Sequence, residues 1–254
     1  MSPLVISLIA FGCIVGGMML GMALRAVLPD HHLSEDSRDV VKLGTGMIAT
    51  LAALVLGLLI ASAKGNFDAM NNGLVQAGSK VILLDRLMAQ YGPETREARD
   101  LLRRGVAFTI DNISQNGRTE QTETRALHAG IGLETIQDKL RQLSPQNDAQ
   151  RWLQLQALRV SIEVAEVRWL LVERKGHSEL PMPLFVILVF WLVVIFFIFG
   201  LLSPRNETAI VILLVCALSA AASLFMMLEL DNPFGGLINL STTPLRDALL
   251  YIGQ

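Results

Sequence analysis

Residues that could bind or conduct ions gather at two places in this chain. The first is an apolar stretch, residues 43–63, in which small side chains recur at steps of three or four: Gly46, Thr50, Ala53, Gly57 and Ala61. At about 100° per residue, these five share one face of a helix. A small face lets a second helix approach closely, or it leaves room for ions in a narrow path, and both interpretations stay open.

The second place is the end of another apolar stretch, where Glu229 and Asp231 are the nearest acids. Several copies of the chain could bring these carboxylates together as an acidic ring at a pore mouth. In the alternative interpretation, Pro233 and the flexible Gly235 form a re-entry turn that lays an amphipathic tail on the membrane.

Motifs of enzyme catalysis are missing from the sequence. It contains no Gly-rich phosphate loop, no His-Glu-x-x-His and no Gly-x-Ser-x-Gly. His31 and His32 stand near Asp30 and Glu35, but a solvated loop explains them better than a metal site does. With a net charge of −2 and no long run of one sign, nothing suggests a nucleic-acid partner. We therefore expect no enzyme, no metal and no cofactor.

The elements that carry these residues are predicted to be membrane helices. Of the 254 residues, 52% are apolar and 17% are charged, with a mean hydropathy of +0.48, which is unusual for a soluble domain. Four stretches carry no charge: residues 4–24, 43–63, 184–203 and 209–228. Each has the roughly 20 residues that span a bilayer, and a span in lipid must be helical. The absence of ionisable groups inside them disfavours a proton-coupled transporter.

The four predicted spans differ in side-chain size. The third contains several Phe residues and a Trp among Val and Ile, whereas the first, second and fourth carry Gly, Ala or Ser at close spacing. Small residues permit close helix packing in lipid. We expect the third span to face lipid and the other three to pack inward.

The polar middle of the chain is predicted to be a helical stalk. A seam with alternating steps of three and four runs on from the second span: Phe67, Met70, Leu74, Ala77, Val81, Leu84, Met88 and Tyr91. It predicts one helix that continues to the break at Gly92-Pro93. A second seam leads into the third span: Leu155, Leu158, Ile162, Ala165, Trp169 and Val172. Shorter helices at 95–113 and 123–143 would complete a hairpin or small bundle.

The expected organisation is therefore an all-α membrane protein in four parts. Residues 1–64 hold the first two spans, 65–180 the helical stalk inserted between spans two and three, 181–231 the last two spans, and 232–254 a turn and an amphipathic tail. In the tail, Ser241 or Thr242 could cap a last helix that begins near Pro244. Its apolar residues are Leu245, Leu249, Leu250 and Ile252.

The end of the fourth span resembles the bestrophin-like domain family, a group of mostly uncharacterised multi-pass membrane proteins of bacteria and plants. Their fourth span typically closes with Leu-Asp-x-Pro-Phe-x-Gly and a following Ser-x-x-Pro. The matching residues here are Leu230, Asp231, Pro233, Phe234, Gly235, Ser241 and Pro244. The turn from Tyr91 to Glu94 is also similar. The resemblance implies an ion-channel-like membrane protein.

Two function classes follow as hypotheses. The first is a homo-oligomeric channel for inorganic ions in the cell (inner) membrane, with the second span lining the path. The second is a non-conducting, membrane-anchored adaptor or sensor whose stalk dimerises or binds a partner; a subunit of a larger transport complex is a minor variant. Four spans place both termini and the middle domain on one side, which we assign to the cytoplasm.

Overall fold

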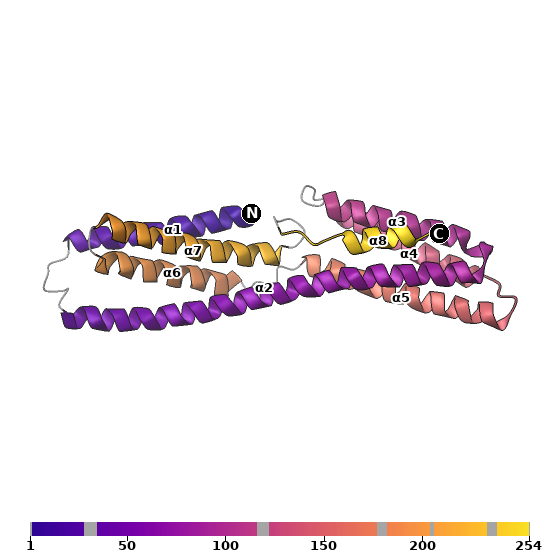
Figure 1. Cartoon of the computed structure of the whole chain (residues 1–254), viewed down its shortest axis with the longest axis horizontal. Helices are drawn as coiled ribbons and strands as arrows, with labels where there is room; N and C mark the ends of the chain where they lie inside the picture. The colour runs from indigo at the N-terminus through magenta and orange to yellow at the C-terminus, as the bar shows by residue number, and fades with distance from the viewer. Residues whose placement is uncertain are drawn as a thin grey trace. The chain divides into compact units, whose positions relative to one another are not determined.

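The computed structural model describes residues 2–27, 35–115, 122–176, 182–203, 206–232 and 238–253. Side chains at 35–37, 112–115, 122–131 and 171–176 are outside the description. Every regular element in the described ranges is helical (Figure 1), which confirms the all-α class. In chain order the helices are α1 Pro3–Val27, α2 Glu35–Tyr91, η2 Pro93–Thr95, α3 Arg96–Gln115, α4 Thr122–Gln142, α5 Asp148–Gly176, α6 Met182–Leu202, α7 Glu207–Asp231 and α8 Thr243–Tyr251.

Four of these helices are long and apolar enough to cross a membrane: α1, the first part of α2, α6 and α7. They contain the four charge-free stretches that the sequence predicts as spans, except that α6 ends at Leu202, one residue before the end of the third stretch. The prediction of four helices that are long and apolar enough to span a membrane is therefore confirmed among the described residues.

The helix α2 runs without interruption for 57 residues. It ends where predicted, because Gly92 adopts φ = 139°, a left-handed conformation that side-chain-bearing residues rarely adopt, and Pro93 follows it. Thr95 then fixes the turn, since its hydroxyl lies 2.5 Å from the Met88 carbonyl oxygen and 2.8 Å from that of Gly92.

The chain divides into two compact units. The first comprises Met1–Asn66 and Ser178–Asn232, and the second comprises Phe67–His177 and Pro233–Gln254. The helix α2 contributes residues to both. The predicted four-part organisation, with a stalk outside the membrane, stays a proposal and is taken up below.

In the first unit, α1 packs against α6 and α7. The contact with α6 is close because glycine stands on both sides of it. A Cβ atom at Gly21 would collide with the Phe197 carbonyl oxygen, and one at Gly200 with that of Met18. The expectation that the third span simply faces lipid is therefore wrong for one face. That face buries Leu188, Ile195 and Phe196, while Val186 and Phe190 are exposed on others.

The second unit has a hydrophobic core to which α2, α3, α4, α5 and α8 contribute. The seam predicted on α2 is confirmed: Met70, Leu74, Val81, Leu84, Met88 and Tyr91 are buried, and Phe67 and Ala77 are partly buried. The seam predicted on α5 is only partly the packed face, since Leu158 and Ala165 pack against the core. The seam members Leu155, Ile162 and Trp169 are exposed, and α5 instead buries Ala157, Val160, Val164 and Val167. Val172 lies outside the described side chains.

The C-terminal helix α8 packs on α3. Leu245, Ala248 and Ile252 are buried in the second unit, and Leu249 is partly buried. The interpretation of a tail lying on the membrane is therefore wrong for this face, because the helical bundle covers it. Leu250, expected among the apolar residues, is exposed on the other side.

Candidate functional site

The small face of α2 is open. Gly46, Thr50, Ala53, Gly57 and Ala61 are all exposed, and no atom lies within 4 Å of the place where a Cβ would stand at Gly46 or Gly57. Of the two interpretations of this face, packing against another helix of the same chain finds no support among the described residues. The face is free for a second copy or for an aqueous path.

The side of α2 away from the small face is covered within the chain. Thr45, Ala52, Leu59 and Ala63 are buried, and their steps of seven, seven and four place them on one face. At about 100° per residue, this buried face points more than a quarter-turn away from the small face. The helix α2 is thus held by one side and presents the small residues on the other.

Large apolar side chains border the small face. Met47, Leu51, Leu54 and Leu58 are exposed, and their positions place them next to the small residues around the helix. The membrane part of α2 therefore has three faces: a buried one, a small one and a large apolar one. Lipid suits the large face, because lipid tails are as apolar as these side chains.

Thr50 is the polar residue of the small face. Its hydroxyl donates to the Gly46 carbonyl oxygen at 2.8 Å. The hydrogen is therefore occupied by the helix, while the oxygen keeps lone pairs that can accept a hydrogen bond from water or contact a cation. This arrangement offers no nucleophile or acid, but it suits a neutral lining for water or ions.

The acids at the end of α7 differ in burial. Glu229 is only 3% exposed, and its backbone carbonyl accepts the N–H of Asn232 at 3.2 Å as the helix ends. Asp231 is partly exposed. An acidic ring would therefore rest on Asp231 rather than on Glu229. The motif residues Pro233, Phe234 and Gly235 lie outside the described residues.

The motif residues Ser241 and Pro244 shape the start of α8 in the second unit. The Ser241 hydroxyl oxygen accepts the Thr243 N–H at 3.2 Å, and the Ser241 hydroxyl donates to Thr243 Oγ1 at 2.8 Å. Pro244 occupies the first turn of the helix. A last helix beginning near Pro244 is confirmed, with Ser241 rather than Thr242 providing the side-chain bond.

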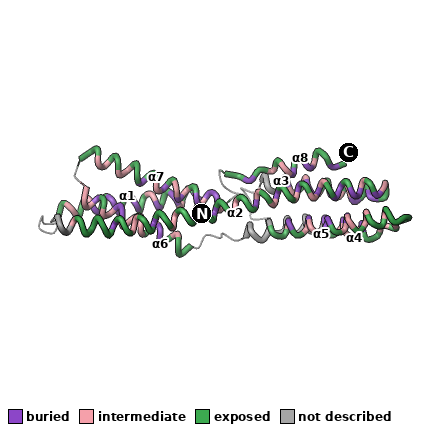
Figure 2. The backbone as a smooth tube through the Cα atoms, turned by 60° about the horizontal axis from the view of Figure 1, so that its bottom comes forward, coloured by how far each residue is buried: buried purple, intermediate pink, exposed green. Residues whose placement is uncertain are grey.

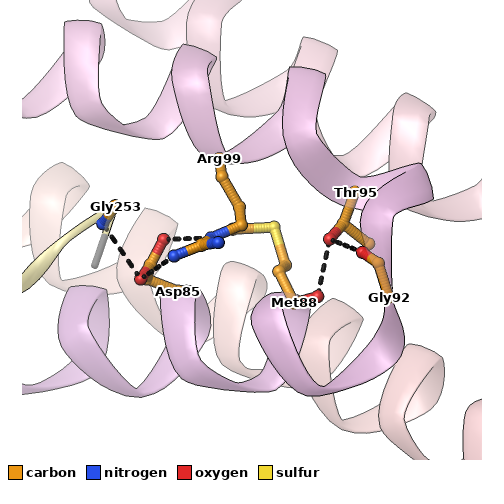
Figure 3. A network of polar contacts seen from close by, with 6 residues as sticks. All are labelled: Asp85, Met88, Gly92, Thr95, Arg99 and Gly253. Atoms are coloured by element: carbon orange, nitrogen blue, oxygen red, sulfur yellow. Dashed lines mark hydrogen bonds and ion pairs between the residues drawn. The ribbon is translucent and has the colours of Figure 1, made fainter.

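A buried ion pair in the second unit was missed by the sequence analysis (Figure 3). Arg99 of α3 donates to both carboxylate oxygens of Asp85, and the Gly253 N–H donates to Asp85 Oδ2 at 3.4 Å. The hydrogen bond to Asp85 raises the pKa of Arg99, although burial opposes it. The sequence held one sign of this ion pair: the acid Asp85 stands directly beside the buried seam position Leu84.

Within the described ranges, no three His, Cys, Asp or Glu side chains come together in a way that could hold a metal ion. His31, His32 and Asp30 lie outside those ranges. The expectation that the chain needs no metal or cofactor stays a prediction.

Comparison with known proteins places this arrangement among related folds. A family model described as the Bestrophin-like domain matches residues 12–245. No curated protein matches the chain.

Solved structures resemble the fold over most of the chain. A point mutant of a bacterial bestrophin homologue from Klebsiella pneumoniae is 15% identical, with a TM-score of 0.64 over 95% of this chain and 99% of that one. Another crystal structure of that homologue, phased on zinc, gives 16% identity and a TM-score of 0.63 at the same coverage. A crystal structure of a membrane protein gives 14% and 0.66, covering 95% and 97%. At these identities the likeness establishes the fold.

Proposed function

The chain belongs to the bestrophin-like domain family, and from this premise we propose that it is a homo-oligomeric ion channel of the cell membrane in which α2 lines the path. The observation that carries the proposal is the exposed small face of α2: Gly46, Thr50, Ala53, Gly57 and Ala61. The chain leaves this face uncovered while it holds the same helix by the buried face around Ala52 and Leu59.

Several copies are needed for a path. Four helices of one chain enclose little space, whereas a ring of identical copies places the same helix around a common axis. Small side chains then set the width of the path, because they leave the most room between facing backbones. The large apolar face of α2, with Leu54 and Leu58, would meet lipid or the next copy.

The lining would be neutral. The stretch 43–63 carries no charged residue, so ions would pass a short apolar constriction whose wetting controls conduction. Thr50 Oγ1 would supply the polar contact along this face. At the end of α7, Asp231 from each copy would add negative charge near a pore mouth and favour cations.

The second unit would stand outside the membrane in the cytoplasm, as the domain inserted between the second and third spans, together with the C-terminal tail. Its exposed surface carries the ion pairs Lys139–Glu97 and Arg141–Asp138, as expected for a solvated domain. Protease treatment of inside-out vesicles should cleave this unit. A unit protected in such vesicles and cleaved in right-side-out cells would reverse the orientation.

The test of conduction is ion flux through purified protein in planar bilayers. We expect the wild-type oligomer to conduct, and Gly57→Leu or Thr50→Leu to reduce single-channel conductance severalfold by narrowing the path. Leu51→Phe, which adds volume on the neighbouring large face, serves as the matched control and should conduct like wild type. A folded wild-type oligomer without conductance would end the proposal.

One observation favours the alternative of a membrane-anchored adaptor. The helix α5 exposes large apolar residues, including Trp152 and Trp169, and exposed patches of this kind usually mark binding surfaces. A silent oligomer in the bilayer experiment would favour the adaptor. Conductance that responds to Gly57→Leu would exclude it as the main function.

A further inference from the structure

One face of α5 is exposed and unusually apolar. It consists of Trp152, Leu155, Arg159, Ile162, Glu166 and Trp169, at steps of three, four, three, four and three; we name it the α5 stripe. Its four apolar members are each 50–60% exposed. The helix α5 buries a different set, Ala157, Val160 and Val164, in the core of its own unit. The apolar members of the stripe are therefore not part of that core. Tryptophan at an exposed helix face is typical of protein interfaces.

A second apolar surface lies on α8 in the same unit. Leu250 is 70% exposed and Tyr251 is 54% exposed; with the exposed Arg246 and Asp247, they form what we name the α8 patch. The other side of α8 is fixed in the core by Leu245. Figures 1 and 2 show α8 and α5 on opposite sides of this unit. Two different apolar surfaces on opposite sides suit head-to-tail contact between copies.

Side-chain contacts between α2 and α5 fix the height of the α5 stripe along α2. Gln150 Nε2 donates to the Tyr91 carbonyl oxygen at 3.1 Å, and Lys80 Nζ lies 3.4 Å from Glu163 Oε2. The helices α2 and α5 are therefore antiparallel, with Lys80 level with Glu163. Counting from this pair, α2 positions 78–85 stand level with α5 positions 158–165.

The helix α8 spans the same height. Its start lies at Gly78, where a Cβ would stand 2.8 Å from the Pro244 carbonyl oxygen. Its end lies at Asp85, which accepts the Gly253 N–H. Leu250 and Tyr251 therefore stand level with the part of the stripe around Arg159 and Ile162, and Arg246 stands closer to the level of Glu166.

We infer that the copies assemble head to tail in a ring, with the α5 stripe of one copy packed on the α8 patch of the next. The inference rests on the proposed oligomeric channel, because cyclic symmetry keeps every residue at the height of its counterpart. At equal height, Ile162 meets Leu250, the Arg159 guanidinium meets the Tyr251 ring, and Glu166 approaches Arg246. Apolar surface is thus matched with apolar surface, and opposite charges face each other.

The area is adequate for a subunit contact. The apolar residues that stand at or near the height of α8, Leu155, Ile162, Leu250 and Tyr251, expose roughly 450 Å² together, taking the full areas usual for such side chains. A standard interface buries about 1,600 Å² in total, with a little over half of it apolar. The contact would therefore supply about half of the apolar area of a standard interface, and the membrane helices would add to it.

The first test is the mass of the full-length, detergent-purified protein, measured by light scattering after size exclusion. We expect Ile162→Glu and Leu250→Glu to shift the oligomer to smaller species. Val75→Glu, on an exposed part of α2 in the same unit, should keep the wild-type mass. Glu166→Arg should weaken assembly, and adding Arg246→Glu should restore it. If either residue only supported its own unit, the second charge reversal would not restore assembly.

The second test uses disulfide crosslinking in a background in which Cys13 and Cys216 are replaced by Ala. The double variant Ile162→Cys/Leu250→Cys should give a ladder of covalent multimers on mild oxidation, because each copy then links to two neighbours. Ile162→Cys alone and Leu250→Cys alone should give no such ladder. A disulfide dimer from Ile162→Cys alone would mean that two stripes face each other and would overturn the inference, as would the absence of a ladder.

Failure of this inference and failure of the proposed channel give different results. A conducting oligomer that gives no ladder would rule out only the α5–α8 contact. A ladder in a protein that passes no ions would rule out the proposed channel and would support the α5–α8 contact. A monomeric wild-type protein would rule out both the channel and the α5–α8 contact.

Discussion

The Asp85 carboxylate and the Arg99 guanidinium form a two-pronged ion pair between α2 and α3, with Nε–Oδ1 at 2.8 Å and Nη2–Oδ2 at 2.9 Å. The Asp85 side chain is almost fully buried, and Arg99 is largely covered. The pair closes the turn at Gly92-Pro93 and receives the Gly253 N–H on the same carboxylate. It therefore joins three segments of the second unit that are distant in sequence.

Asp85→Asn should destabilise the second unit by about 3 kcal/mol, because removing one partner leaves the other charge buried and uncompensated. The measurement is hydrogen exchange of the α2 and α3 amides in the full-length protein. Asp138→Asn breaks the exposed pair with Arg141 and should change protection by less than about 1 kcal/mol. Equal effects of the two variants would contradict this account of Asp85.

Tyr91 should make the second unit less stable at high pH. Burial raises the pKa of its phenol above the ordinary 10.0, and Glu94 adds to the effect. Above pH 10, the unfolded chain loses the phenolic proton while the folded chain keeps it. The unfolded state then binds fewer protons, so the free energy of unfolding falls as pH rises through this range.

The chain has two tyrosines, so a Tyr251→Phe variant reports on Tyr91 alone. Its phenolate absorbance should appear at higher pH in the native protein than in denaturant. Superimposed titration curves would show that burial does not act on this phenol. Tyr91→Phe should lose less stability between neutral pH and pH above 10 than the wild type does.

Much of this fold follows from local patterns. The C-terminal end of α2 was predictable because an unbroken seam leads to Gly92-Pro93, a break that depends on backbone chemistry alone. The packed face of α5 was not, since the helix carries two apolar stripes and periodicity does not tell which one a neighbour will cover. Ile162 belongs to the seam that the sequence predicts as the packed one, and it is nevertheless exposed.

The candidate site was predictable in composition but not in burial. Spacing alone placed Gly46 to Ala61 on one face, yet whether the chain covers this face depends on how α1, α6 and α7 pack. Glu229 shows the same limit: its position at the end of a span made it a candidate for an acidic ring at a pore mouth, and the fold buries it. The partner of Asp85 is 14 residues away, across a turn whose geometry decides the contact.

Gly21→Ala should disrupt the packing of α1 on α6. The added Cβ would collide with the Phe197 carbonyl oxygen, and backbone cannot rotate away as a side chain can. Overpacking of this kind costs about 1–3 kcal/mol, so the thermal midpoint in detergent should fall. Gly12→Ala is the matched control on the same helix, because nothing lies within 4 Å of its added Cβ. A drop of similar size in both variants would point to a loss of helix flexibility instead.

Gly78→Ala should loosen the docking of α8. The added Cβ would stand 2.8 Å from the Pro244 carbonyl oxygen, which is closer than such atoms approach, so α8 must move outward and lose contacts of Leu245 and Ile252 with the core. Gly65→Ala places a methyl group in open space on the same helix. It should leave α8 in place and stabilise α2 slightly, since Ala favours helix by about 1 kcal/mol over Gly.

Limited proteolysis of full-length protein measures this docking, with cleavage on the N-terminal side of α8 expected several times faster in Gly78→Ala than in Gly65→Ala. If the α8 patch also contacts the next copy, the loosened helix should weaken the oligomer as well. Faster cleavage with an unchanged oligomer mass would then separate the fixing of α8 within its own unit from any contact between copies. Equal cleavage of both variants would show that the Gly78–Pro244 approach does not hold α8.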